Sequence, residues 1–178
     1  MNSLNSKQTY LQVEICIQDC FEESDRCTIA LETWEHWFHQ WLTLQQADLP
    51  TASGYELSLR LTDDIEIQSL NAQYRQQDRP TDVLAFAALE VDMPRPSSQA
   101  ISLPIYLGDI IISVDTAEKQ AQLQGHSLQT ELAWLSSHGL LHLLGWDHPD
   151  DDSLICMLNQ QEALLSAIGL TVKGENPS

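Results

Sequence analysis

Short stretches in which apolar residues alternate with polar ones recur along the chain and predict four β-strands. The first is a half-buried strand, because Leu11, Val13, Ile15 and Ile17 occupy every second position. The third has a nearly continuous apolar centre, VLAFAAL, and we expect it to be mostly buried on both faces. The strands after the first are predicted at Tyr55–Leu61, Asp82–Leu89 and Tyr106–Val114.

Apolar positions at helical spacing predict five helices between and after these strands. The first helix has an aromatic face, which we interpret as a buried surface and not as a platform for stacking a ligand. That face consists of Trp34, Trp37, Phe38 and Trp41. Asp115 and Glu118 are expected to form a capping box at the start of the third helix, and Gly145 a left-handed cap after the fourth. The helices are predicted at Thr28–Gln46, Asp63–Tyr74, Asp115–Gly125 and Ser127–Leu144, and a last helix is predicted to follow the acidic turn Asp150-Asp151-Asp152 and to end at Gly169.

Strands and helices that do not alternate regularly predict an α+β fold, in which helices cover a mixed sheet of about four strands. The strand order cannot be read from the sequence. Residues 1–170 are expected to form a single domain, because neither an internal repeat nor a linker divides them. A loop rich in Pro and Ser is predicted at 93–104, and the polar residues 171–178 are expected to form a disordered tail.

Charge and cysteine content limit the range of functions that the protein can have. Of the 178 residues, 26 are Asp or Glu and 8 are Lys or Arg, a net charge of -18, so nucleic acid would have to be bound by a local basic spot. Neither a secretory signal nor an apolar run of about 20 residues is found, and we expect a cytoplasmic protein that does not bind membranes. Cys16, Cys20, Cys27 and Cys156 are interpreted as reduced thiols, with a metal site among the first three as the alternative.

The segment SHGLLHLLGWDHP, residues 137–149, contains three of the six histidines. His138 and His142 are four residues apart on a predicted helix and therefore face the same way. Gly145 allows the chain to turn and bring His148 to the same point. Three imidazoles without a fourth protein ligand are typical of a catalytic zinc site, and we predict one Zn²⁺ per chain.

Other candidate ligands are given structural interpretations. His36 and His39 lie beside the aromatic face with no third ligand nearby in sequence, so we expect ordinary helix residues. The acidic turn of Asp150, Asp151 and Asp152 could bind a cation, but acidic residues also favour any helix N-terminus, which is the interpretation we prefer.

The three histidines match the metzincin peptidase pattern H-E-x-x-H-x-x-G-x-x-H with one departure, because Gly139 occupies the position of the glutamate. In those peptidases the glutamate takes a proton from the zinc-bound water. Glycine has no side chain that could do so, and peptidase activity by that mechanism is therefore disfavoured.

The histidine segment resembles the signature of the YbeY endoribonucleases, also called ribosomal RNA maturation factors. LNAQYRQQDRPTDVLAF, residues 70–86, and YLGDIII, residues 106–112, resemble two further blocks of that family. The resemblance covers residues 57–169 or so and implies a zincin-like metal helix. It further implies a cytoplasmic zinc enzyme that cuts single-stranded RNA, matures the 3′ end of 16S ribosomal RNA and acts in ribosome quality control. The implied partners are the 16S precursor and components of the small ribosomal subunit.

By the same resemblance, His138, His142 and His148 are the metal ligands, and Arg75 is the functionally important arginine. Arg75 could bind a phosphate through two hydrogen bonds, and with Arg79 it is the best candidate for the local basic spot. Members of the family commonly have Ser and Pro where this chain has Ala85 and Ala87, so a role for that serine hydroxyl is not expected here.

Four points stay open at the level of sequence. The general base is not identified, nor is the attacking group, which is either water or the 2′-hydroxyl of the substrate. Asp147 could orient a histidine or cap the turn, and it is assigned no role. The alternatives to a nuclease are a zinc peptidase or other amide hydrolase, and a ribosome-assembly binding factor with a structural zinc.

Overall fold

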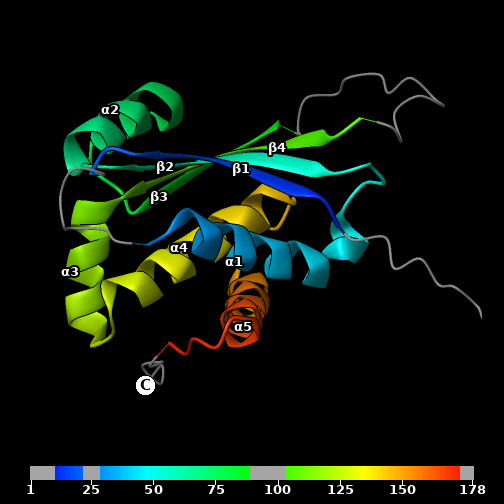
Figure 1. Cartoon of the computed structure of the whole chain (residues 1–178). Coiled ribbons are helices and arrows are strands. Elements are labelled where there is room, and N and C mark those ends of the chain that lie inside the picture. The colour runs from blue at the N-terminus through cyan, green and yellow to red at the C-terminus, as the bar shows by residue number, and fades with distance from the viewer. Residues whose placement is uncertain (1–10, 22–28, 89–102, 173–178) are drawn as a thin grey trace, which may run out of the picture.

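A four-stranded mixed sheet forms the centre of the molecule (Figure 1). The computed structural model describes residues 11–21, 29–88 and 103–172. The strands are β1 (Val13–Asp19), β2 (Tyr55–Thr62), β3 (Val83–Ala87) and β4 (Ile105–Ser113). They lie in the order β1-β2-β4-β3, with β1, β2 and β4 parallel and β3 antiparallel to β4 at one edge. The predicted α+β fold with a mixed sheet is confirmed, and the structure supplies the strand order.

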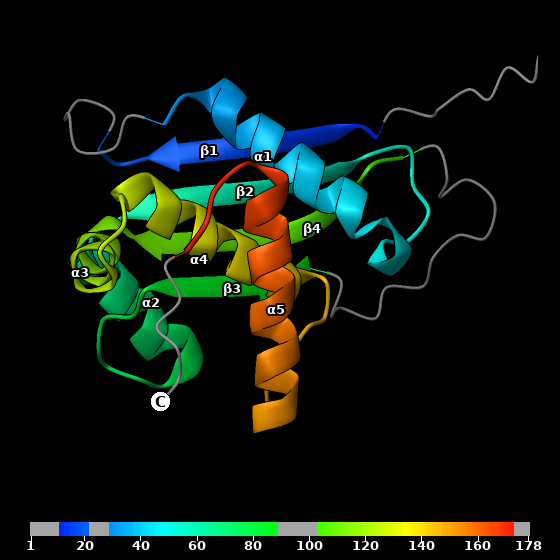
Figure 2. The same ribbon diagram turned by 90° about the horizontal axis from the view of Figure 1, so that it is seen from below.

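Helices cover both faces of this sheet (Figures 1 and 2). One face is covered by α1 and α4, and α5 packs beneath these two helices, while α2 covers the other face. Within the described ranges, no helix is long and apolar enough to cross a membrane. The helices are α1 (Leu31–Leu44), the short 3-10 helix η1 (Gln46–Asp48), α2 (Asp64–Arg75), α3 (Val114–Gln124), α4 (Leu128–Leu143) and α5 (Asp151–Ala167).

The aromatic face of α1 lies in the core, as predicted. Trp34, Trp37, Phe38 and Trp41 are all at most 4% exposed. The rings of Trp34 and Trp37, and those of Phe38 and Trp41, meet edge to face at 5.0 Å between centroids, a favourable aromatic geometry. The Trp41 indole N–H donates a hydrogen bond of 2.9 Å to the carbonyl of Leu164, which fastens α1 to α5.

A bulge in β4 lies next to the point where β3 meets that strand. Glu56 of β2 is opposite Tyr106, but Leu57 is opposite Gly108, so one extra residue of β4 is left unpaired. Gly108 has a φ of 139°, and a Cβ atom there would lie 2.2 Å from the carbonyl oxygen of Phe86 on β3. Only glycine allows β3 to lie this close to β4 at that point.

Two details of the prediction are wrong. In β3 only Leu84 is buried, because Val83, Ala85 and Ala87 line a cavity and the strand lies at the edge of the sheet. The cap of α3 is Ser113 and not Asp115, since the Ser113 hydroxyl accepts a hydrogen bond from the N–H of Thr116. Asp115 instead accepts a hydrogen bond of 2.9 Å from the N–H of Asp64, at the start of α2.

The remaining predicted elements agree with the structure to within about three residues at each end. Cys16, Cys20 and Cys156 are free, as expected, and they are exposed, while Cys27 is outside the described residues. Most of the predicted loop at 93–104 and of the predicted tail at 171–178 is also outside them.

Candidate metal centre

Helix α4 places His138 and His142 on one face, one turn apart. The helix begins at Ser127, whose hydroxyl accepts a hydrogen bond from the N–H of Thr130. Gly145 follows the helix with a φ of 95°, as predicted, and the N–H of Trp146 donates back to the carbonyl of Leu141.

The loop after α4 is held against the body of the protein. The Trp146 indole N–H donates to the carboxylate of Asp48, at 3.2 Å, and the Asp147 carboxylate accepts from the N–H of His148, at 2.8 Å. The first contact ties the loop to η1, and the second lies within the loop, beside the third histidine.

The structure brings the three histidines together. One ring nitrogen from each of His138, His142 and His148 lies within 4.8 Å of the other two. The Nε2 atoms of His138 and His142 are 3.0 Å apart, and nitrogens that share a tetrahedral zinc are roughly 3.3 Å apart, given metal–nitrogen bonds of about 2.0–2.1 Å. The donor set and its spacing fit a metal ion, which this group could bind.

Burial favours the neutral form that a metal ligand needs. Loss of solvent lowers the pKa of His138 below 6.5. The pKa of His142 is also lowered, mainly by burial and further by the neighbouring His138 and His148. Both imidazoles are therefore neutral at pH 7 and can offer a lone pair.

Gln161 on α5 is a contact of this centre that the sequence analysis missed. It is completely buried, and its Oε1 atom lies 3.0 Å from Nδ1 of His138. A signal was present in the sequence, because Gln161 shares a helix face with the apolar residues Met157 and Leu164. A polar residue on such a face usually has a buried partner.

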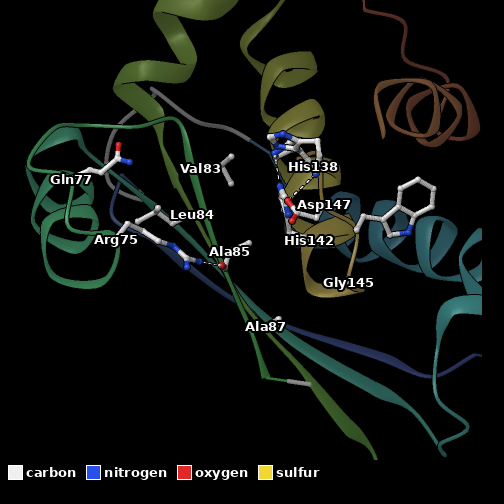
Figure 3. A pocket seen from close by; sticks show the side chains of 13 residues that line it. Arg75, Gln77, Val83, Leu84, Ala85, Ala87, His138, His142, Gly145 and Asp147 are labelled. Carbon is white, nitrogen blue, oxygen red and sulfur yellow. Dashed lines mark hydrogen bonds between the residues drawn. The ribbon is translucent and has the colours of Figure 1, made fainter. Parts of the chain in front are cut away.

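The histidines open into a cavity of about 820 Å³ (Figure 3). Val83, Ala85 and Ala87 of β3 form one wall, and the histidines of α4 and the following loop form another. Gly145, Trp146 and Asp147 from that loop complete the rim.

Arg75, at the end of α2, lines the same cavity. One guanidinium nitrogen donates a hydrogen bond of 2.9 Å to the carbonyl of Ala85, and the guanidinium carbon lies 5.2 Å from the centre of the Phe86 ring. Figure 3 shows the side chain reaching β3, with the histidines facing the cavity from α4. The fold therefore places a fixed positive charge at the cavity that the histidines share.

Gly139 allows α4 to pack closely on the sheet. A Cβ atom there would lie 2.8 Å from Cγ2 of Ile110, which is fully buried in β4. A glutamate at this position would collide with the core as well as change the chemistry. The packing therefore adds a second reason against the peptidase mechanism.

The other candidates do not join the centre. Arg79 donates to the Gln77 side chain at 2.6 Å and is absent from the cavity lining, so it does not extend the basic spot there. His39 contacts the carbonyl of Leu11 at 3.0 Å and is not among the residues that line the cavity. Asp150 caps α5 by accepting from the N–H of Ser153 at 2.8 Å, as the preferred interpretation of the acidic turn requires.

Comparisons with known proteins agree with this architecture. The family model described as Endoribonuclease YbeY matches residues 19–169. A relative from Nostoc sp., named Endoribonuclease YbeY, is 56% identical over 180 residues, covering 95% of this chain and 97% of its own. A relative of the same name from Cyanothece sp. is 56% identical over 169 residues, covering 94% and 97%.

Among solved structures, the solution structure of a Thermotoga maritima protein has the same fold, with a TM-score of 0.53. It is 23% identical, and the match covers 92% of this chain and 98% of the other. The similarity to curated relatives extends over nearly the whole chain, and the expected class of enzyme, an endoribonuclease, is confirmed with it. The chain belongs to the YbeY endoribonuclease family.

Proposed function

We propose that this chain is a zinc-dependent endoribonuclease that cuts single-stranded RNA. Its substrate is the 16S ribosomal RNA precursor, matured at its 3′ end, and it acts in the cytoplasm in ribosome quality control, together with components of the small ribosomal subunit. The observation that carries the chemistry is a group of three histidines that shares one cavity with Arg75.

The ligands proposed for zinc are His138, His142 and His148. Among the described residues this group has three members, so a tetrahedral ion would keep one position open for chemistry. When bound, zinc supplies Lewis acidity, which polarises a phosphoryl oxygen and makes water a stronger acid.

Arg75 is proposed to bind the scissile phosphate. A guanidinium has five N–H donors, and the bond to the Ala85 carbonyl uses one nitrogen and orients the group. Donors therefore remain for phosphate oxygens, where charge develops as the phosphodiester bond breaks. An unpaired strand can bend a phosphate into the cavity more readily than a stiff duplex can.

The metal assignment predicts about one zinc per chain. His142→Ala should lose both the metal and RNA cleavage, because only two imidazoles would remain, and these are too few to hold the ion. His36→Ala is the matched control, since His36 is exposed on α1, and it should keep the metal. Elemental analysis and cleavage assays of the purified variants test this, and a zinc content unchanged in His142→Ala would contradict the site.

The role of Arg75 predicts a different pattern. Arg75→Ala should leave zinc content and melting temperature nearly unchanged but slow RNA cleavage about a hundredfold or more, the usual cost of losing one transition-state contact. Arg75→Lys should restore the rate only in part, because an ammonium cannot make the planar two-point contact. Arg79→Ala is the control and should cleave at the parental rate. Parental cleavage by Arg75→Ala would make Arg75 an ordinary surface charge.

A substrate panel separates the proposal from the two other hypotheses. Single-stranded RNA should be cut faster than a perfect duplex of the same sequence, and a mixed peptide pool should be left intact. Peptide cleavage would favour the amide hydrolase. Tight RNA binding without any cleavage would favour a binding factor whose zinc is structural.

A further inference from the structure

Gln161 is a fully buried polar side chain that contacts the candidate metal centre. It lies in the middle of α5 with none of its surface exposed, between the buried residues Met157 and Leu164. A buried amide destabilises a protein unless its hydrogen bonds are made. The two polar atoms of this amide must therefore both have partners.

Both partners belong to α4. Oε1 lies 3.0 Å from Nδ1 of His138, and Nε2 lies 3.4 Å from the carbonyl oxygen of Trp134, one turn earlier on the helix. The carbonyl of Trp134 can only accept, and the reverse direction of the amide would place two acceptor oxygens against each other, so the nitrogen is the atom that faces Trp134. The oxygen of Gln161 is thus the atom that faces His138.

This direction determines which nitrogen of His138 carries the hydrogen. The amide oxygen can only accept, so Nδ1 must be the protonated nitrogen of the neutral ring. The lone pair is then on Nε2, the atom that lies 3.0 Å from Nε2 of His142 and faces the shared point of the three rings.

We propose that Gln161 is a positioning residue that holds neutral His138 in the Nδ1–H tautomer, with its lone pair directed at the metal. This inference rests on the proposed metal function. A hydrogen bond to the second ring nitrogen commonly fixes the orientation of a metal-binding histidine. Gln161 provides it through a neutral amide and so adds no negative charge behind the ligand.

The tautomer can be measured without metal or substrate. Long-range ¹H–¹⁵N spectra of metal-free protein at pH 8 distinguish the two ring nitrogens of each neutral histidine. We expect His138 to be in the Nδ1–H form in the parental protein and a mixture of both forms in Gln161→Met, which keeps the volume of the side chain but removes the acceptor. A parental His138 in the Nε2–H form would overturn the proposal, even if the variant does not fold.

Zinc affinity, measured by competition with a chelator, gives the second readout. Gln161→Met should weaken binding about 10- to 100-fold, the usual effect of removing such a partner. Gln161→Glu retains an acceptor for Nδ1–H and should recover most of this loss. Gln160→Met, at the neighbouring and partly exposed position, is the matched control and should bind zinc like the parent.

The two readouts separate the possible failures. A merely structural role would change the melting temperature of Gln161→Met but would leave zinc affinity and tautomer unchanged, and that result would overturn the inference. If the parental protein bound no zinc, the proposed metal function would fail, while the tautomer would still decide whether Gln161 orients His138.

Discussion

The residue at position 139 affects both the reaction that the candidate metal centre could catalyse and the packing of α4 on the sheet. In the sequence, Gly139 is notable because a metzincin peptidase has a glutamate there. In the structure, the missing side chain also allows α4 to approach β4, since a Cβ atom would lie 2.8 Å from Cγ2 of Ile110. Close packing of this kind is sensitive to a single added methyl group.

Gly139→Ala should therefore destabilise the fold. Overpacking costs about 1–3 kcal/mol, and the better helix propensity of alanine offsets at most about 1 kcal/mol of that. We expect the free energy of unfolding in urea to fall by roughly 1 kcal/mol. The loss should shrink in an Ile110→Ala background, where the obstructing atom is gone. A Gly139→Ala protein as stable as its parent would show that the core can move aside.

Residues with local signals could be predicted, and residues that depend on tertiary contacts could not. The spacing of His138 and His142 on one helix and the glycine at 145 are sufficient to predict that three imidazoles converge. Gln161 lies on the next helix, and its partner is defined only when α5 packs on α4. Neither the spacing nor the composition of the chain links these two positions.

At the scale of elements, sequence patterns predict whether a segment is a helix or a strand better than they predict which elements it packs against. The aromatic spacing in α1 and the alternation in β1 were sufficient, because each reports on one element and its own buried face. The apolar run in β3 did not reveal an edge strand, since the number of neighbours depends on pairing with β4. The start of α3 was misplaced because Ser113 and Asp115 are both good caps, and Asp115 is used by α2.

Asp64 ties the starts of α2 and α3 together. Its carboxylate accepts hydrogen bonds of 2.6 Å from the hydroxyls of Ser113 and Thr116, and Lys119 lies 3.5 Å away. Partial burial opposes ionisation of this carboxyl group. The hydrogen bonds and the lysine outweigh burial and lower the pKa of Asp64 below 3.8.

A lowered carboxyl pKa makes stability depend on pH in a known direction. The ionised Asp64 stabilises the fold above its unfolded pKa of about 3.9, and this contribution is lost as the pH falls through the lower folded value. Asp64→Asn should therefore reduce the free energy of unfolding by about 1 kcal/mol at pH 7 and by progressively less below pH 4. Urea unfolding across this range measures the difference. Glu35→Gln, the same charge change at an exposed site on α1, should show little effect.

At the scale of the whole molecule, the charge is strongly negative and unevenly placed. Arg60 is paired with Glu66, and Lys119 is within 3.5 Å of Asp64. Of the cations in the described ranges, Arg75 is the one that lines the cavity. An RNA strand would therefore meet one fixed positive charge at this cavity, on a chain whose net charge is -18.

This distribution predicts a shallow salt dependence for binding of single-stranded RNA. The logarithm of the binding constant falls with the logarithm of salt concentration by about 0.7 for each phosphate neutralised. One or two contacts give a slope of roughly -1, and Arg75→Ala should reduce it further. Titrations with a short oligonucleotide between about 0.05 and 0.3 M KCl provide the measurement. A slope steeper than about -4 would instead indicate a broad basic interface.

The proposed ligands lie close together in the chain as well as in the fold. His138, His142 and His148 span eleven residues, whereas Gln161 and the wall of β3 come from other segments. A denatured chain keeps all three imidazoles within one short segment and would therefore retain some affinity for the proposed zinc. By mass action, zinc would then stabilise the native state only by the difference between its affinities for the two states. Folding contributes the orientation of the ligands, since the sequence already holds them near one another.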